Sequence, residues 1–260
     1  MRTTRLPNAL EVAYLNRGEL EFLYEEIFGR EVYLKHGLRL DDGARVVDVG
    51  ANIGLFALWA SRRAQNVRID ALEPIPEIFA VLAANAARHF GGARLHRAAL
   101  GEAHGRAPFA YYPKAAGWST RHPAPRAVRE SLRAYASGLR ERPVAAWLAR
   151  TPWLFAAATR PLFRAVPREC EVTTLSALLR AQSIASVDLL KIDVEGGELG
   201  VLAGIEGADW PRIGQVTMEV GAACLAEAVA VLRSRGFAVV AEQPQMLRGT
   251  AYHHVYARRP

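Results

Sequence analysis

The stretch that decides the fold is Val46-Val47-Asp48-Val49-Gly50-Ala51-Asn52-Ile53-Gly54, followed at once by the apolar residues 55–60. The β-branched residues predict a buried strand, the glycines a tight turn, and the apolar run a helix that starts at the turn. Backbone N–H groups at such a helix N-terminus can face a ligand with no side chain in the way. Nicotinamide, flavin, nucleotide and S-adenosylmethionine (SAM) enzymes all use this arrangement, so it locates a site before it identifies a chemistry.

The spacing of the glycines narrows these alternatives. The dinucleotide pattern G-x-G-x-x-G is absent, because Asn52 takes the place of its second glycine and Gly54 comes one place too early. A phosphate-binding P-loop is excluded, since no lysine followed by Ser or Thr is present. Asp48 would repel a pyrophosphate but suits a ligand that carries ammonium and sulfonium charges, and Glu73 ends the next strand, where an acid hydrogen-bonds a ribose diol. These residues predict a SAM pocket; the alternative is a structural turn with a capping aspartate.

Length and composition agree with one catalytic domain. The chain has 260 residues, of which 51% are hydrophobic, enough for a sizeable core. No apolar run approaches the ~20 residues that span a bilayer, and the first ten residues lack the apolar part of a secretory signal. Cys170 and Cys224 lie in unrelated contexts without metal-binding spacing. We therefore expect reduced thiols, a cytoplasmic protein and no membrane partner.

The formal net charge of +7 is concentrated in one segment. Residues 126–168 contain nine arginines against Glu130 and Glu141, together with Trp147, Trp153 and several prolines. The prolines predict short helices. Such a basic helical insertion can be a plain solvated element, a lid over a pocket, or a dock for an acidic partner. Basic residues interleaved with aromatics also occur in RNA-binding proteins, but nucleic acid is the least favoured partner here.

Strands and helices alternate on both sides of this insertion. Strands are expected at 45–49, 67–72, 93–98, 107–112, 187–193, 213–219, 237–241 and 251–258, and helices at 17–36, 53–64, 76–90, 175–182, 196–204 and 222–235. The pattern predicts an α/β fold with a doubly wound, mostly parallel seven-stranded sheet of the Rossmann-like type that ends in an antiparallel edge hairpin. Residues 1–40 would form an N-terminal helical cap, 41–125 and 169–260 the SAM-binding domain, and 126–168 the insertion or lid.

A second group of ionisable residues follows the fourth parallel strand, in Lys191-Ile192-Asp193-Val194-Glu195-Gly196. Ligands of open α/β sheets bind beyond the carboxyl ends of the strands, so these residues should face the same crevice as the first loop. Alternation along the strand places Lys191, Asp193 and Glu195 on one side. Asp193 or Glu195 is predicted to orient or deprotonate an acceptor hydroxyl, with Lys191 holding the carboxylates in place. The alternative is a buried Lys–Asp pair and a helix-capping glutamate.

Further acceptor-side candidates come from other strands. Glu219 ends the next strand and is expected at the same rim, and His254 on the final strand and Tyr33 are also candidates. Each histidine or tyrosine can equally be a satisfied core or surface residue. A divalent metal bridging the acids at this rim is conceivable, but the sequence lacks a decisive ligand spacing, and no metal is predicted.

Several segments, taken in order, carry a resemblance to a known family. They are 48–54, Glu73-Pro74, Ala98-Ala99-Leu100-Gly101, Thr173-Thr174-Leu175-Ser176 and 191–196. In this order they resemble the FkbM-type SAM-dependent methyltransferases over about residues 30–258, most of all the subgroup associated with polyketide and nonribosomal peptide pathways. The resemblance implies O-methylation of a small hydroxylated natural product or sugar, with S-adenosylhomocysteine (SAH) as the second product. Carried over by position, it implies that SAM is contacted by Asp48, Gly50, Ala51, Asn52 and Gly54 at its amino-acid part, by Glu73 with Pro74 at its ribose, and by Ala99 and Leu100 at its adenine.

The implied acceptor is a small molecule, free or tethered to a carrier protein, and the sequence leaves a homodimer open. N-methylation of an amine and methylation of rRNA or tRNA would use the same cofactor pocket. A different class altogether would be a catalytically silent SAM-fold protein that docks a carrier protein or synthase through its arginine-rich segment. For an enzyme, alignment of donor and acceptor is expected to matter more than proton abstraction, because the sulfonium is already a good leaving group.

Overall fold

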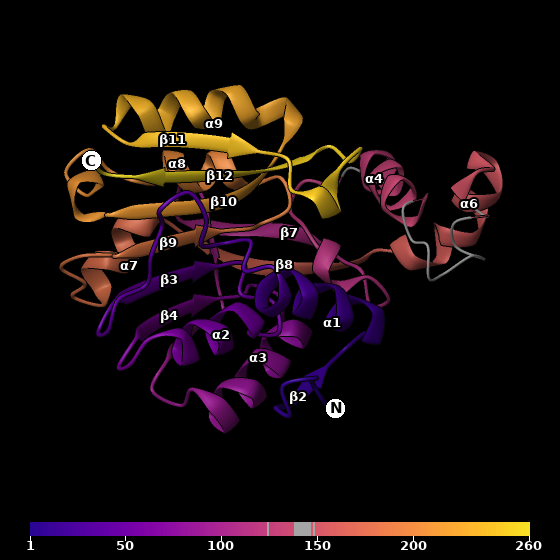
Figure 1. Ribbon diagram of the computed structural model, residues 1–260, viewed down its shortest axis with the longest axis horizontal. Coiled ribbons are helices and arrows are strands. Elements are labelled where there is room, and N and C mark those ends of the chain that lie inside the picture. The colour runs from indigo at the N-terminus through magenta and orange to yellow at the C-terminus, as the bar shows by residue number, and fades with distance from the viewer. Residues whose placement is uncertain (124, 138–146, 148) are drawn as a thin grey trace.

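The computed structural model describes residues 1–123, 125–137, 147 and 149–260, and its centre is a seven-stranded sheet in the order β11-β12-β10-β9-β3-β4-β5 (Figure 1). The strands are β3 (Arg45–Val49), β4 (Arg68–Leu72), β5 (Arg94–His96), β9 (Leu189–Ile192), β10 (Gln215–Gly221), β11 (Ala238–Glu242) and β12 (Tyr252–Arg258). Neighbouring strands run parallel except for β12, which is antiparallel to both β10 and β11. The predicted mostly parallel sheet with its antiparallel hairpin is confirmed. Strand β12 lies between β10 and β11, so β11 is the edge strand of the sheet.

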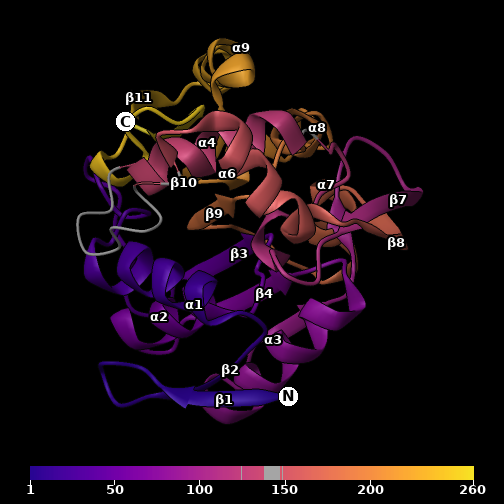
Figure 2. The same cartoon turned by 90° about the vertical axis from the view of Figure 1, so that its right-hand side faces the viewer.

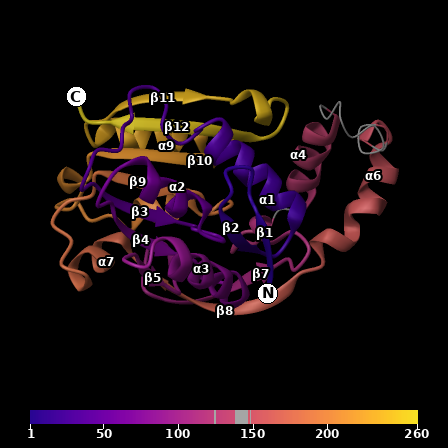
Figure 3. The same cartoon turned by 60° about the horizontal axis from the view of Figure 1, so that its bottom comes forward.

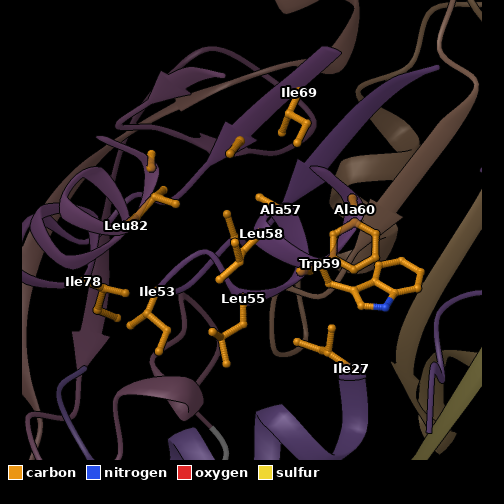
Figure 4. Packing of buried hydrophobic residues seen from close by; sticks show 14 of the residues in the cluster. Ile27, Ile53, Leu55, Ala57, Leu58, Trp59, Ala60, Ile69, Ile78 and Leu82 are labelled. Carbon is orange, nitrogen blue, oxygen red and sulfur yellow. The ribbon is translucent and has the colours of Figure 1, made fainter. Parts of the chain in front are cut away.

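Helices cover both faces of this sheet. They are α2 (Leu55–Arg63), α3 (Pro76–His89), α7 (Leu175–Ala181), α8 (Glu198–Ala203) and α9 (Ala222–Ser234). The buried residues form two main clusters, and β3 contributes to both, since Val46 packs on the side of α2 and α3 while Val47 and Val49 pack on the side of α7, α8 and α9. Figure 4 shows the first cluster, in which Leu55 and Leu58 of α2 meet Ile27 and Ile53. Strand β3 is therefore covered by apolar side chains on both faces, as its β-branched sequence predicts.

The N-terminal part differs from the predicted helical cap. Strands β1 (Arg2–Arg5) and β2 (Glu11–Tyr14) form a hairpin, and α1 (Arg17–Tyr24) continues into the π-helical turn η1 (Glu25–Gly29) (Figure 2). The helix predicted for 17–36 thus ends at Gly29, because the following Val32 and Tyr33 are buried in the core in non-helical backbone. Asn85 of α3 ties the hairpin down: its side chain accepts from the N–H of Ala13 and donates to the carbonyl oxygens of Ala13 and Ile53.

A second, three-stranded sheet was not predicted. It contains β6 (Ala99–Leu100), β8 (Val166–Thr173) and β7 (Gly105–Tyr111) in the order β6-β8-β7. A strand was expected at 107–112, where β7 lies, but β8 was not expected, and it begins at Val166 within the segment expected to be the insertion. Its first residues include Pro167 and Arg168, which interrupt the apolar pattern typical of a strand. They are extended because β8 pairs with the whole of β7.

The insertion between these strands protrudes beyond the carboxyl ends of the parallel strands (Figures 1 and 3). Its helices are α4 (Pro125–Ser137), α6 (Pro152–Thr159) and η3 (Arg160–Phe163); short 3-10 turns elsewhere are η2 (Ala116–Trp118), η4 (Trp210–Arg212) and η5 (Gln245–Leu247). Ala136, Ala149 and Phe155 form a small separate cluster that joins α4 to α6. Arg140 and Arg142 of the predicted basic set lie outside the described residues. Within the described ranges, no helix combines the length and the hydrophobicity needed to cross a bilayer.

Candidate active site

The turn after β3 is shaped by two glycines that no other residue can replace without conflict. Gly50 has φ +76°, and a Cβ at this position would lie 1.8 Å from the carbonyl oxygen of Asp193. Gly54, with φ +86°, caps α2, and a Cβ there would lie 2.7 Å from Leu82 Cδ1. The backbone therefore has to pass directly against the end of β9 on one side and against α3 on the other. Positive φ and the lack of space for a Cβ together explain why both positions are glycine.

Asp48 lies beneath this turn and pairs with Lys191. The two residues are opposite one another in the register of β3 and β9, and Lys191 Nζ lies 3.2 Å from Asp48 Oδ1. The same ammonium donates to the carbonyl oxygen of Gly50 at 2.8 Å, so it also holds the turn. Burial raises the pKa of Asp48 and is opposed by Lys191; burial lowers the pKa of Lys191, but the charges of Asp48 and Asp193 outweigh it and raise that pKa. Asp48, predicted to contact the cofactor, is thus fully buried in an ion pair across the sheet and lies outside the cavity wall.

The turn opens into one large cavity of about 790 Å³ at the carboxyl ends of the parallel strands. This volume falls within the range of small-molecule and cofactor sites. Among the predicted SAM contacts, those in its wall are Gly50, Ala51, Asn52, Glu73, Pro74, Ala99 and Leu100. Asp48 and Gly54 support this wall from behind. The structure thus brings the end of β3, the end of β4 and strand β6 to one cavity, as the sequence predicts.

Glu73 stands at the end of β4 with its carboxylate held by backbone groups. Oε2 accepts from the N–H of Asn52 at 3.2 Å and Oε1 from the N–H of Ile75 at 3.0 Å. The residue is only 5% exposed, and burial raises its pKa to about 7, against the two backbone hydrogen bonds that lower it. Glu73 therefore links the turn after β3 to the segment after β4, and its charge changes near neutral pH.

The acceptor end of the cavity begins next to the turn after β3, where Asp193, Glu195 and Glu219 offer carboxylate oxygens within 4.8 Å of one another. The Tyr33 hydroxyl donates to Asp193 Oδ2 at 3.0 Å, and Lys191 Nζ lies 3.6 Å from the same oxygen. The three acids come from the end of β9, the loop after it, and β10. We call this group the acceptor-side carboxylates. Asp193 and Glu195, with Lys191 beside them, are thus brought together as predicted.

The other two carboxylates each have a neutral or basic neighbour on β12. The Tyr252 hydroxyl donates to Glu195, and His254 Nε2 lies 3.3 Å from Glu219 Oε2. Burial raises the pKa of Glu195 well above its usual range. Burial also raises the pKa of Glu219, and the hydrogen bond from His254 opposes this rise.

His254 itself is fully buried and is not in the cavity wall. Its ring packs against Tyr33, with 5.3 Å between the ring centroids, and it lies behind Glu219. Register explains the position, because His254 pairs with Glu219 across β10 and β12. The structure therefore places this predicted catalytic residue behind Glu219 and outside the cavity wall.

Two residues of the acceptor end were missed from the sequence. Glu26 of η1 is 3% exposed, lies in the cavity wall, and has its pKa raised well above the usual range by burial and by the charges of Glu219 and Asp193. The sequence did offer a signal for Glu26, because it is an acid that lies between the apolar Leu23 and Ile27 on a core-facing helix. Tyr252 had no local signal, because only its pairing opposite Gly221 brings it to the cavity.

A doubly wound sheet of this topology, with a glycine turn after its first parallel strand, an acid after its second, and a cavity over both, is the architecture of a class I SAM-dependent methyltransferase. The family described as Methyltransferase FkbM domain matches residues 48–239 of this chain. The chain belongs to this family and is a SAM-dependent methyltransferase of the FkbM type.

The chain is also similar to individual proteins. The chain is 43% identical to the 31-O-demethyl-FK506 methyltransferase FkbM of Streptomyces tacrolimicus, with 100% of this chain and 97% of that protein covered. It is 34% identical to part of the AMB antimetabolite synthetase AmbE of Pseudomonas aeruginosa, covering 98% of this chain and 12% of the synthetase. Among solved structures, a precorrin-6y C5,15-methyltransferase from Geobacter metallireducens superposes with a TM-score of 0.46 at 17% identity, over 89% of this chain and 86% of that one.

The cavity end near β3 fits the cofactor of this class. Gly50 brings bare backbone to the wall where a side chain would fill the space, and the neighbouring Glu73 is a buried hydrogen-bond acceptor at the end of β4. Ala99 and Leu100 add an apolar edge. Backbone groups, one acid and an apolar edge match the amino-acid, ribose and adenine parts of SAM respectively.

Proposed function

We propose that this protein transfers the methyl group of SAM to a hydroxyl oxygen of a small natural product of the polyketide, nonribosomal peptide or sugar type. The observation that carries the proposal is the meeting, in one cavity, of the backbone turn at 50–53 with the acceptor-side carboxylates. The Streptomyces relative, a methyltransferase for 31-O-demethyl-FK506, supports a hydroxyl acceptor. The similarity to part of a synthetase supports an acceptor that is carried on a protein as an alternative to a free one.

The donor end has to hold and orient SAM. Bound SAM supplies a methyl group on a sulfonium, which is a good leaving group without further activation. The turn at 50–52 would hold the amino-acid part through backbone groups, Glu73 would accept hydrogen bonds from the ribose hydroxyls, and Ala99 and Leu100 would flank the adenine. Lys191 keeps this turn in place through its bond to the carbonyl oxygen of Gly50. The contribution of these residues is alignment of the methyl group with the acceptor and exclusion of water.

The acceptor end combines an ionisable floor with apolar walls. Leu132 of α4, Phe155 of α6 and Phe163 of η3 line the same cavity as the carboxylates. An acceptor with a large apolar surface and an exposed hydroxyl suits such walls, since the apolar part packs against the insertion while the hydroxyl reaches the floor. Asp193 would orient this hydroxyl, and one of the glutamates would take its proton. The insertion would then act as the lid of the acceptor site.

Two measurements test the proposal. Isothermal titration with SAM and with SAH should show binding of both at a single site, and binding of neither would contradict an enzyme of this class. Incubation with methyl-¹³C-labelled SAM and 31-O-demethyl-FK506 as the first acceptor should give a product one methyl group heavier. The ¹³C shift of the new methyl then separates a methyl ether from an N-methyl amine, and an N-methyl product from an amine acceptor would correct the acceptor atom.

A further inference from the structure

The three acceptor-side carboxylates differ in what holds them. Asp193 faces the ammonium of Lys191 and the hydroxyl of Tyr33. Glu195 receives a hydrogen bond from the neutral Tyr252. Glu219 is contacted by an imidazole, that of His254, and 14% of its own side chain is exposed. These different partners give the acids different chemical roles.

The protonation of His254 follows from its surroundings. Its ring is fully buried, and Nδ1 has no hydrogen-bond partner among the residues that the structure describes. A buried N–H without an acceptor costs about 1–3 kcal/mol, and such orphaned N–H groups are rarer than acceptors left without a donor. The proton therefore belongs on Nε2, which faces Glu219 Oε2. In this tautomer Nε2 donates and cannot accept, so His254 cannot take a proton from a ligand through the nitrogen that faces the site.

We propose that Glu219 is the catalytic base for the acceptor hydroxyl and that His254 is its positioning residue. This inference rests on the proposed O-methylation and goes further by naming the base. As the acceptor oxygen bonds to the methyl carbon, its O–H bond breaks and the proton goes to Glu219, while the electron pair of the carbon–sulfur bond stays on sulfur. The products are a methyl ether, SAH and a protonated Glu219, which returns its proton to water.

The neighbouring acids are less suited to this role. Protonation of Asp193 would remove the charge that balances Lys191 at 3.6 Å. Glu195 accepts a hydrogen bond from the Tyr252 hydroxyl, and burial raises the pKa of Glu195 well above its usual range, which disfavours the charged form that a base needs. The pKa of Glu219 is also raised by burial, but the hydrogen bond from His254 and the charge of Lys191 oppose this rise and favour the charged carboxylate that a base needs.

Charged and titratable groups face Glu219 from every element around it. They are Glu26 of η1, Tyr33 after it, Lys191 and Asp193 at the end of β9, Glu195 in the following loop, Glu198 of α8, and Tyr252 and His254 of β12. Among these, only Lys191 and His254 lower the pKa of Glu219. The donor that His254 supplies is therefore the part of this environment that a single substitution can change without touching the cavity wall.

Kinetics provide the first arm of the test, with 31-O-demethyl-FK506 as acceptor. Glu219→Gln should lower kcat by about 10²–10⁴-fold with unchanged SAH affinity. Glu242→Gln is the matched control, because Glu242 Oε2 also contacts a histidine, His36 Nε2 at 2.9 Å, but lies outside the cavity. This control should keep the wild-type kcat. A wild-type kcat in Glu219→Gln, or an activity that EDTA abolishes and Mg²⁺ restores, would overturn the assignment of the base.

The positioning role is tested by the pH profile. His254→Leu removes the donor that lowers the pKa of Glu219, so the acid limb of the kcat profile should move to higher pH. In His254→Gln the side-chain amide can donate from near the position of Nε2, and the limb should return toward its wild-type position. A merely structural role would lower activity in both variants and leave the limb in place, which would overturn the proposal.

A second arm needs no acceptor. In protein labelled with [5-¹³C]glutamate, the Glu219 signal is the one that is missing from Glu219→Gln. It should titrate above the usual range of a glutamate and move higher still in His254→Leu. A Glu219 that titrates in the usual range and ignores His254 would overturn the inference even if the enzyme were active. If the wild-type enzyme does not turn over 31-O-demethyl-FK506 but Glu219 titrates above the usual range and responds to His254→Leu, only the proposed acceptor is contradicted.

Discussion

The two ends of the cavity are built from different parts of the polypeptide. At the cofactor end Gly50 exposes backbone to the cavity, and the acid Glu73 is held by backbone N–H groups. At the acceptor end the wall is made of ionisable side chains from η1, β9, β10 and β12. Backbone atoms suit the cofactor, which stays the same. Substitution of side chains at the acceptor end can alter which acceptor binds without disturbing the fold. Lys191 belongs to both ends, since it contacts the carbonyl oxygen of Gly50 and the carboxylate of Asp193.

The largest loss of stability and cofactor binding is expected from substitution of Gly50, where the cofactor end leaves no space for a side chain. In Gly50→Ala the new Cβ would overlap the carbonyl oxygen of Asp193, so either the turn or the end of β9 has to move. We expect loss of measurable SAH binding by calorimetry and a fall of more than about 4 kcal/mol in the free energy of unfolding in urea.

Gly43→Ala is the matched control for this prediction. Gly43 also has positive φ, at +74°, but a Cβ there would meet no atom of the described residues within 4 Å. Only the cost of the left-handed backbone remains, about 1–2 kcal/mol, and SAH binding should persist. Equal losses in the two variants would show that backbone conformation alone, and not the contact with Asp193, governs Gly50.

The next effect tests the residue that joins the two ends. Lys191→Met leaves Asp48 buried without a counter-charge, which should lower the free energy of unfolding by about 3–5 kcal/mol at neutral pH. Without Lys191 the pKa of Asp48, already raised by burial, rises further. The folded protein then binds a proton more tightly than the unfolded chain, so the loss should shrink as the pH falls. Urea unfolding at several pH values measures this.

The double variant Asp48→Asn/Lys191→Met separates charge from shape. It removes both members of the pair, so it should be more stable at neutral pH than Lys191→Met alone. If both proteins are destabilised equally, the ammonium acts mainly through the carbonyl oxygen of Gly50. The pair would then be a support for the turn and not a source of charge balance.

This comparison also explains what the sequence could predict. The cofactor end is local: β3, the turn and α2 are contiguous, and Gly50 and Glu73 follow from a strand–turn–helix pattern that needs no knowledge of distant residues. Parallel strands also place their carboxyl ends on one edge, so the meeting of Glu73 and Asp193 in one cavity could be expected.

The acceptor end depends on register between distant strands. His254 faces Glu219 because β12 enters between β10 and β11 in one particular alignment, and a shift of one residue would turn it to the other face. The partner of Asp48 was missed for the same reason, since Lys191 lies opposite it on another strand. Glu26 is aimed at the cavity by the π-helical turn, whose wider winding no periodicity of the sequence indicates.

A moderate effect is expected when Glu73 of the cofactor end is changed. Glu73→Gln should weaken SAH binding roughly 10–100-fold at pH 8, the loss of about 1.5–3 kcal/mol that separates a charged from a neutral acceptor. Because burial raises the pKa of Glu73 to about 7, its charge is lost as the pH falls toward 6. Wild-type affinity should therefore fall between pH 8 and pH 6, while that of Glu73→Gln should stay level.

Glu77→Gln is the control for Glu73, four positions along the chain. Glu77 pairs with Arg168 outside the cavity wall, and this partner lowers its pKa. Its substitution should leave both the SAH affinity and the pH dependence unchanged. A pH dependence that persists in Glu73→Gln would assign the titration to another group of the cavity.

The smallest effect is expected at Tyr33, and it measures how far the two ends are independent. Tyr33→Phe removes the hydroxyl that donates to Asp193 but keeps an aromatic ring over the ammonium of Lys191, which lies 5.6 Å from the ring centroid. The loss of one hydrogen bond should lower stability by about 1 kcal/mol and kcat by less than roughly tenfold. SAH affinity should not change. If it falls together with kcat, displacement of Asp193 is transmitted through Lys191 to the turn at Gly50, and the two ends act as one unit.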